Sequence, residues 1–223
     1  MLGTPAPDGW AEPLTGRWPE PGPYGRHIAE PLLDTLELRT DAGCGLAIGP
    51  WPRFRYDASG GGGTGVAGET SADGWQPLHF DPAGLTIPAL NGRTGRILGV
   101  PLPPGIAIAI RPQQLAGRWQ PETGRVELAF EARFQLLLAG RSVAPDLQVV
   151  TQLGTGEANW QRGPVAGRPL DAEGRGVLVG VALVPPTGEG WLDRFLGLPG
   201  EALAVLCCQL KVLPREAGDQ RAG

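Results

Sequence analysis

The segment from residue 105 to residue 138 constrains the fold more strongly than any other part of the chain. Its second half, RVELAFEARFQLLL, alternates apolar and polar side chains over most of its length. In an extended strand these two sets lie on opposite faces, whereas a helix would mix them. The apolar face comprises Val126, Leu128, Phe130, Ala132, Phe134, Leu136 and Leu138. The first half alternates in the same way, and the PETG sequence between the halves is typical of a turn. The segment therefore predicts a long antiparallel hairpin.

Several further strands follow from the same kind of pattern. Pro112 lies inside the first half of the hairpin and cannot donate a backbone hydrogen bond, so we expect a bulge or bend there. Alternation also predicts strands at 33–40, 53–56 and 146–153. Residues 176–184 are apolar on both faces, which is typical of a strand that is covered on both sides.

Together these segments predict an all-β, mainly antiparallel domain, either a β-sandwich or a flattened barrel of about eight to ten strands. One short helix is expected near the C-terminus, at 191–196. Residues 202–213 fit a helix or a strand, and we favour a strand because the segment is short and follows Pro-Gly. We expect a single domain over residues 31–213. The Pro- and Gly-rich residues 1–30 and the polar residues 214–223 are predicted to be disordered tails.

Composition narrows the classes of function. The formal net charge is −4, so the chain has no basic field for nucleic acid. No apolar stretch is long enough to span a membrane, and the first thirty residues lack the apolar core of a secretion signal. We therefore expect a cytoplasmic protein. The three cysteines, Cys44, Cys207 and Cys208, have no metal-binding spacing and are expected to be reduced.

No motif for catalysis or a cofactor has the context that it needs. Residues 60–65, GGGGTG, satisfy the spacing of a dinucleotide-binding loop, but the sequence that follows cannot form the required helix. We interpret this segment as a flexible surface loop. The two histidines, His27 and His79, have no metal-ligating cluster beside them. We therefore predict no enzymatic activity, no catalytic residues, no cofactor and no metal.

Aromatic residues are the remaining candidates for binding. Trp10, Trp18 and Tyr24 lie in the Pro-rich N-terminal segment, where an extended chain can present them to a protein partner. Trp119, with Val126, Leu128, Phe130, Phe134 and Leu136, is predicted to form either the core or the wall of an apolar ligand site. Other tryptophans lie beside turns or strand ends, where they serve as rim packing or as a ligand mouth: Trp51, Trp75, Trp160 and Trp191.

Two segments, LAGRWQPETGRVELAFEARF (115–134) and LVGVALVPPTGEGWLDRFLGLP (178–199), resemble parts of an uncharacterised β-rich protein family of cyanobacteria and plastids. The resemblance extends over roughly residues 33–213. It implies a photosynthetic host and a cytoplasmic or thylakoid-facing location, and it carries no known activity. The hairpin also resembles lipid-binding YceI-like barrels, whose exported members carry a signal peptide.

Two leading functions remain open from the sequence, and an enzyme whose site no motif reveals is a third. The first is a non-catalytic accessory or interaction protein, associated peripherally with a photosynthetic membrane complex through an unidentified protein partner. The alternative is a carrier or binder of a small apolar molecule, such as a lipid or pigment, inside the β domain. An interior cavity of at least ~300 Å³ would favour the alternative, and a fully packed interior would exclude it.

Overall fold

The predicted hairpin is the longest feature of the computed structural model, which describes residues 33–213. It consists of β9 (Ile106–Gln120) and β10 (Arg125–Leu138), which pair from Arg125 opposite Gln120 to Leu138 opposite Ile106. The turn closes at Gly124, whose φ of 68° is a left-handed conformation that suits glycine. The hairpin prediction is confirmed.

The expected irregularity at Pro112 is present as a β-bulge. Pro112 lies opposite Ala132 and Gln114 lies opposite Glu131, so Gln113 is the extra residue on β9. Because proline has no amide hydrogen to give to the ladder, the bulge removes the need for one. The outer face of the hairpin is polar, and Arg118 and Glu127 pair across the strands at 2.8 Å.

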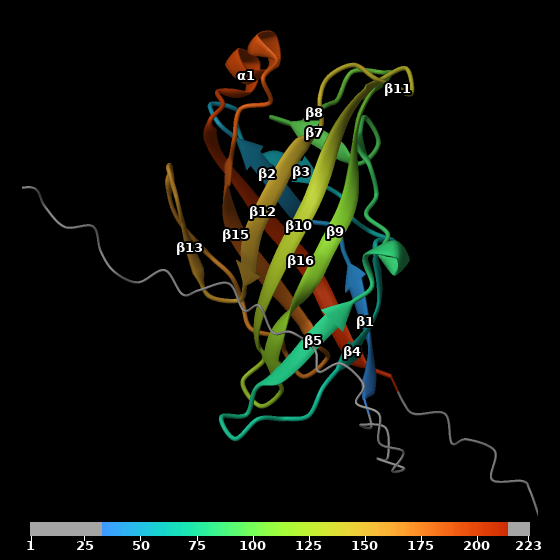
Figure 1. Cartoon of the computed structure of the whole chain (residues 1–223), viewed down its shortest axis with the longest axis vertical. Coiled ribbons are helices and arrows are strands. Elements are labelled where there is room, and N and C mark those ends of the chain that lie inside the picture. The colour runs from blue at the N-terminus through green and yellow to red at the C-terminus, as the bar shows by residue number, and fades with distance from the viewer. Residues whose placement is uncertain (1–32, 214–223) are drawn as a thin grey trace, which may run out of the picture. The chain divides into compact units, whose positions relative to one another are not determined.

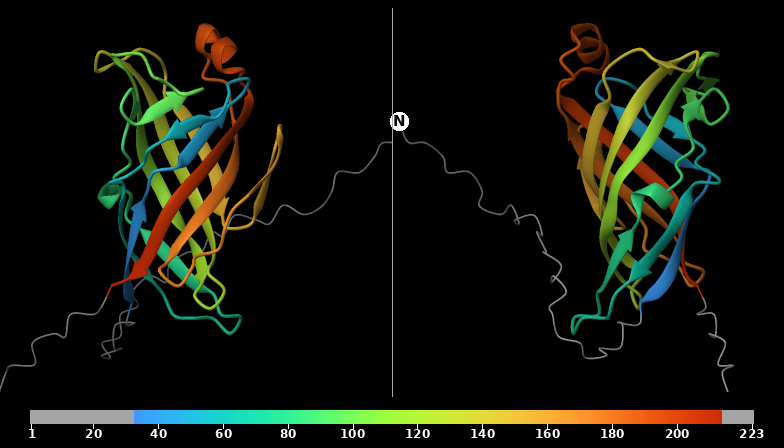
Figure 2. Two further views of the ribbon diagram at one scale, coloured as in Figure 1. Left: turned by 180° about the vertical axis from the view of Figure 1, so that it is seen from behind. Right: turned by 45° about the vertical axis from the view of Figure 1, so that its right-hand side comes forward.

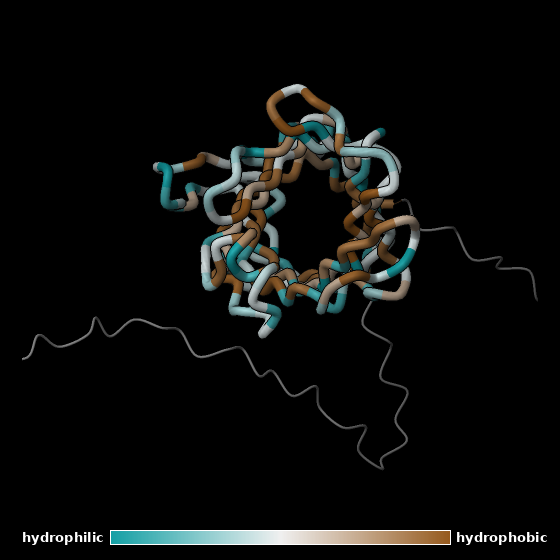
Figure 3. Tube along the Cα trace, turned by 90° about the horizontal axis from the view of Figure 1, so that it is seen from above, coloured by the Kyte–Doolittle hydropathy of each residue, from teal (hydrophilic) through white to brown (hydrophobic). Residues whose placement is uncertain are grey.

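The hairpin belongs to a barrel that closes on itself (Figures 1 and 2). Neighbouring strands follow the order β1-β4-β5-β9-β10-β12-β15-β16, and β16 pairs in turn with β1. All of these pairings are antiparallel. The strands not yet bounded are β1 (Asp34–Thr40), β4 (Gly62–Ala67), β5 (Gln76–Phe80), β12 (Leu147–Gly154), β15 (Arg175–Val184) and β16 (Gly200–Val212). Seen along its axis, the Cα trace of these strands forms a ring (Figure 3).

Shorter strands complete the upper half of the wall as drawn in Figure 1. β16 pairs with β1 through Cys208–Val212 and with β2 through Ala202–Val205, so β1 and β2 lie end to end along it. From β2 the wall continues to β3, β7 and β8, while β6 adds to the upper part of β9 and β11 to the end of β10. Their bounds are β2 (Cys44–Ile48), β3 (Phe54–Tyr56), β6 (Leu90–Asn91), β7 (Gly95–Ile97), β8 (Val100–Pro101) and β11 (Arg141–Ser142).

Three elements lie outside this wall. The hairpin of β13 (Glu157–Trp160) and β14 (Gly163–Ala166) forms a separate two-stranded sheet and covers the outer faces of Val179, Leu203 and Val205. A 3-10 helix covers Pro82–Gly84. The helix α1 (Gly190–Leu196) stands at the upper end of the barrel. Within residues 33–213, no helix is long and apolar enough to cross a membrane.

The all-β, antiparallel fold class and the short helix at 191–196 are confirmed, and the closed ring identifies the fold as a barrel rather than a sandwich. The segment at 202–213 is a strand, as favoured. The Gly-rich segment was predicted wrongly: Gly62–Ala67 is β4, a strand of the ring, and not a flexible loop. Glycine permits this position because a Cβ on Gly62 would collide with the carbonyl oxygen of Leu38.

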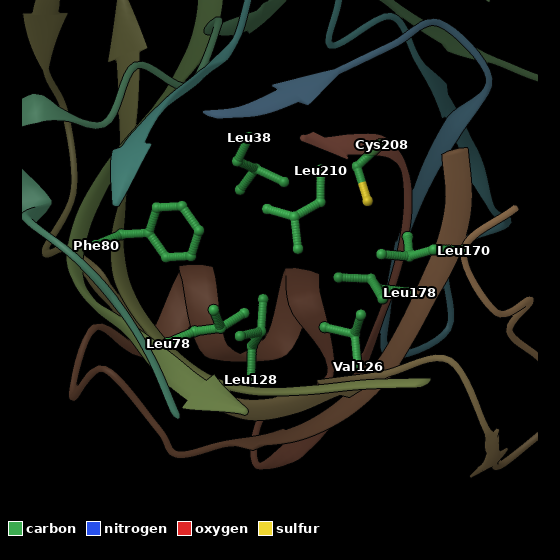
Figure 4. Close-up of a pocket in the computed structure, with 9 residues that line it drawn as sticks. All are labelled: Leu38, Leu78, Phe80, Val126, Leu128, Leu170, Leu178, Cys208 and Leu210. Atoms are coloured by element: carbon green, nitrogen blue, oxygen red, sulfur yellow. The ribbon is translucent and has the colours of Figure 1, made fainter. Parts of the chain in front are cut away.

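The lower end of the barrel is filled by side chains. Phe80 is fully buried at 0% exposure, and Leu36 is buried as completely. Nine of the side chains around the axis leave only about 10 Å³ between them, which is too little for anything larger than a water molecule. Figure 4 shows them pointing inward from the wall: Leu38, Leu78, Phe80, Val126, Leu128, Leu170, Leu178, Cys208 and Leu210. We call this cluster the packed end.

Candidate functional site

Above the packed end the barrel is hollow. The cavity has a volume of about 570 Å³ and is lined from the ring strands, from β2 and β3, and from α1. This volume exceeds the ~300 Å³ at which a pocket accommodates a small organic ligand. The sequence pattern explains the apolar wall, because inward positions alternate along each strand. Ile106, Ile108 and Ile110 of β9 all line the cavity.

The lining is almost wholly apolar. Among residues 33–213, no Asp, Glu, Lys, Arg or His side chain lines the cavity. Its hydroxyl groups belong to Thr40, Tyr56, Thr86 and Thr151, and its one thiol belongs to Cys44. Only Thr86 among these five is exposed to solvent. A small molecule in this cavity would therefore be surrounded by aliphatic and aromatic carbon.

The buried hydroxyl groups already donate to backbone carbonyl groups. Thr40 Oγ1 donates to the oxygen of Ala58 at 2.6 Å, and Thr151 Oγ1 donates to the oxygen of Val181 at 3.0 Å. The Tyr56 hydroxyl donates to the oxygen of Pro88. These bonds satisfy polar groups that would be costly to leave unpaired inside a protein. Because these hydroxyl hydrogens are donated to the backbone, they are not available to a ligand.

Burial keeps the titratable groups of the lining uncharged. It raises the pKa of the Cys44 thiol to about 11, and it raises the pKa of the Tyr56 phenol well above its ordinary value. The Cys44 Sγ donates to the oxygen of Asp41 at 3.2 Å and accepts from the amide of Cys207 at 3.2 Å. At neutral pH neither group provides a thiolate or phenolate for nucleophilic attack.

The cavity reaches the surface at the upper end of the barrel. Four of its five exposed lining residues lie there, and we call them the mouth: Pro103, Pro145, Trp191 and Phe195. The fifth, Thr86, pairs with Gly62 of β4 instead. Trp191 is 50% exposed and Phe195 is 53% exposed. These two come from α1, whereas the prolines come from the loops beside β8 and β11. The mouth therefore combines three segments that are distant in the sequence.

Specific contacts hold α1 at the mouth. Trp51, in the turn between β2 and β3, donates from Nε1 to the oxygen of Phe195 at 2.8 Å, and the two rings lie 4.7 Å apart. At the other end of the helix, the Asp193 carboxylate accepts from the Thr187 hydroxyl at 2.6 Å, which lowers the pKa of Asp193. Gly197 ends the helix in a left-handed conformation. These contacts fix the helix that carries Trp191.

The predicted apolar face is divided between the two parts of the interior. Val126 and Leu128 belong to the packed end, whereas Phe130, Phe134 and Leu136 line the cavity. Leu138, at the end of the same face, is exposed. The predicted face therefore serves as both core and cavity wall, with Phe130 at the boundary. Whether any of these residues contacts a ligand stays a prediction.

The predicted tryptophans lie in different surroundings. Trp119 packs against the packed end and donates from Nε1 to Gln76 Oε1 at 2.8 Å, away from the cavity lining. Trp75 lies under the guanidinium of Arg118 at 4.4 Å. The predicted partner contacts Trp10, Trp18 and Tyr24 lie outside the described residues.

Sequence reasoning missed the parts of the cavity that come from short strands and loops. Leu46 of β2, Leu102 before β9 and Leu206 of β16 line it, together with Phe195. Trp51 and Trp191, whose expected role is rim packing or a ligand mouth, are also among the lining residues. The usable signal was local: Trp191 and Phe195 are four residues apart and so share one face of a helix. No pattern in the sequence shows that this face lies over an opening.

The described part of the chain contains no alternative site with recognisable chemistry. Within residues 33–213, no group of three or more His, Cys, Asp or Glu side chains is placed to hold a metal ion. The three cysteines are free. The apolar cavity is therefore the candidate site of this barrel.

Comparison with known proteins adds no family to this description. No protein-family model matches the chain, and neither the curated proteins nor the solved structures include one that is measurably similar to it.

Proposed function

We propose that this protein is a non-catalytic binder or carrier of a small apolar molecule, which it holds inside the upper half of the barrel. The observation that supports the proposal is the cavity of about 570 Å³ with an apolar wall and a mouth at one end. This is the size and the character of a pocket that encloses a drug-sized ligand.

The cost of the cavity favours a binding role. An empty space deprives its wall of dispersion contacts, and cavities in protein cores cost about 24 cal/mol for each Å³. Water inside the cavity would stabilise the protein little, because a water molecule needs hydrogen-bond partners that this wall does not offer. The packed end shows that the same barrel accommodates tight packing where the side chains are large enough. An apolar ligand would restore the missing contacts.

The chemistry of the lining favours binding over catalysis. General acid–base catalysis needs a group that exchanges protons near neutral pH. Cys44 and Tyr56 are the titratable side chains among the lining residues of the described chain, and burial raises the pKa of both. The wall therefore supplies shape and apolar surface rather than reacting groups.

A neutral fluorescent probe that brightens in apolar surroundings, such as N-phenyl-1-naphthylamine, tests the proposal. We expect the purified full chain to bind this probe saturably. A competing lipid should displace the probe at a ratio of one molecule to one. The variant Ala204→Phe places a ring into the cavity from β16, and we expect it to weaken probe binding at least about ten-fold.

The matched control is Ala109→Phe on β9. Ala109 is half-buried and lies between the inward-facing Ile108 and Ile110, so its side chain points away from the cavity. This control should bind the probe like the unmodified protein. Absence of saturable binding in the unmodified protein, or equal weakening by both variants, would refute the proposal.

A second candidate is peripheral contact with a membrane through the end that carries the mouth. Besides Trp191 and Phe195, apolar side chains are exposed at Leu98 in the β7–β8 turn (81%) and at Leu138 at the end of β10 (51%). Figure 1 shows α1, β7, β8 and β11 at the same end of the barrel. Exposed apolar groups that gather in this way mark contact surfaces. A bilayer at this end would deliver an apolar ligand without passage through water.

Sedimentation with phosphatidylcholine vesicles tests the second candidate. The pair of substitutions Leu98→Ser and Leu138→Ser should reduce the fraction of protein that sediments. Val150→Ser is the control, because Val150 is 58% exposed on β12, on the side of the barrel. Equal sedimentation of all variants, or none by the unmodified protein, would exclude this contact.

A further inference from the structure

The wall of the cavity also restricts the charge of the ligand, an inference that rests on the proposed binding function. A buried carboxylate or phosphate needs cationic groups or several hydrogen-bond donors around it, since removing a charge from water costs far more than removing a neutral group. The lining of the cavity in residues 33–213 provides no Lys, Arg or His side chain. An anion inside this cavity would meet no counter-charge.

The buried part of the lining offers no replacement donors either. The hydroxyl hydrogens of Thr40, Thr151 and Tyr56 are bonded to the backbone oxygens of Ala58, Val181 and Pro88. The Cys44 thiol donates to Asp41. An anion would have to break these bonds to obtain a donor, and the loss of existing hydrogen bonds would offset what the anion gains.

The mouth is suited to a different kind of group. The indole of Trp191 is half exposed at the rim, and within the described chain no acceptor is bonded to its N–H. A single neutral hydroxyl or carbonyl at one end of a ligand can be solvated at such a boundary while the rest of the molecule fills the interior.

We propose that the natural ligand is an uncharged lipid, either a pure hydrocarbon or a long-chain or isoprenoid molecule with at most a neutral oxygen group at one end. Fatty-acid anions and phospholipids bind the cavity more weakly than these neutral lipids, because a charge close to the wall meets no counter-charge. The selection operates by exclusion: the wall binds any apolar body of suitable size and penalises a charge. Broad tolerance for the shape of the apolar body accompanies strict selection by charge.

Three probes that share one alkyl chain test this inference: hexadecan-1-ol, methyl hexadecanoate and hexadecanoate. Each competes with N-phenyl-1-naphthylamine for the full chain at pH 8, below the critical micelle concentration of the anion. We expect the alcohol and the ester to displace the fluorescent probe at concentrations at least about ten-fold lower than the anion. The methyl ester controls for the carbonyl group, because it differs from the anion mainly in charge.

The outcomes separate the two proposals. If hexadecanoate competes as well as the alcohol, the charge selection is wrong while the binding function stands. If the fluorescent probe binds but none of the three lipids displaces it, the lipid assignment is wrong and the cavity takes another kind of apolar molecule. If the fluorescent probe itself does not bind saturably, both proposals fall. The variant Ala204→Phe should weaken the binding of the alcohol and of the ester, which would locate their binding site in the cavity.

Discussion

Replacing one phenylalanine at each end of the barrel should separate the stabilising part of the interior from the hollow part. Phe80→Ala removes a ring from the packed end, where the side chain has no exposed surface. Phe134→Ala removes the same ring from the wall of the cavity. The two changes are chemically identical, so a difference in the free energy of unfolding reports their surroundings.

The expected magnitudes follow from what each ring contacts. Replacing a tightly packed phenylalanine by alanine costs about 3–5 kcal/mol, which combines lost transfer energy with the cavity left behind. Phe80 meets this description, since it contributes to the cluster that surrounds it on all sides. Phe134 is half-buried and one side of its ring faces existing empty space. With contacts on one side only, its removal should cost about 2 kcal/mol or less.

Urea unfolding, followed by tryptophan fluorescence, measures both effects. With a dependence on urea of about 2 kcal/mol per M, the midpoint should fall by about 2 M for Phe80→Ala and by about 1 M or less for Phe134→Ala. Adding a saturating apolar ligand at 100 times its dissociation constant should raise the unfolding free energy of the unmodified protein by about 2.7 kcal/mol. Equal losses for the two variants, or a larger loss for Phe134→Ala, would show that the upper half is packed and would refute the reasoning.

Two further predictions concern single positions. Alkylation of Cys44 by iodoacetamide should be slow at pH 8 and should accelerate as the pH rises toward 11. The thiolate is the reacting form, and burial raises the pKa of this thiol to about 11. Peptide mass spectrometry measures the rate of alkylation, and rapid labelling at pH 8 would contradict this account. Gly62→Ala should destabilise the barrel by more than about 1 kcal/mol in the same urea assay, because its Cβ would collide with the carbonyl oxygen of Leu38 and its φ is 129°. The control Gly84→Ala should have little effect, because no atom lies within 4 Å of the added Cβ.

The hairpin could be predicted because its information is local. Alternation along 125–138 fixes the strand, and the turn at Gly124 fixes the partner. The bulge beside Pro112 could be predicted in the same way, since proline has no amide hydrogen to donate to the neighbouring strand. Each of these features depends on the chemistry of a few consecutive residues.

The Gly-rich strand β4 was not predicted, because its sequence lacks such a local signal. Glycine has no side chain, so a strand in which three of six residues are glycine shows no clear alternation. The cause of the composition lies elsewhere in the sequence: a Cβ on Gly65 would lie 2.5 Å from the ring of Phe80 on the neighbouring strand β5. Only the paired structure shows that a bulky residue on one strand requires a small one opposite it.

The cavity could not have been predicted from the sequence. The alternation shows that Phe130 and Phe134 face inward, but both a packed and a hollow interior have this pattern. The volume depends on how far the opposite wall stands away and on the size of side chains such as Ala204. Those quantities are set by closure of the whole ring, to which strands from residue 34 to residue 212 contribute.

The pairing of β1 with β16 joins the first and last strands of the described barrel. A ribosome completes β16 only after the rest of the ring has been made, so the cylinder cannot close during synthesis of its earlier strands. Until then the inward faces of the upper half have no opposite wall and are open to water and to chaperones. Closure over such a long sequence separation is slow. A chain that ends before Gly200 would therefore provide no partial binding site, because the enclosed space exists only in the finished ring.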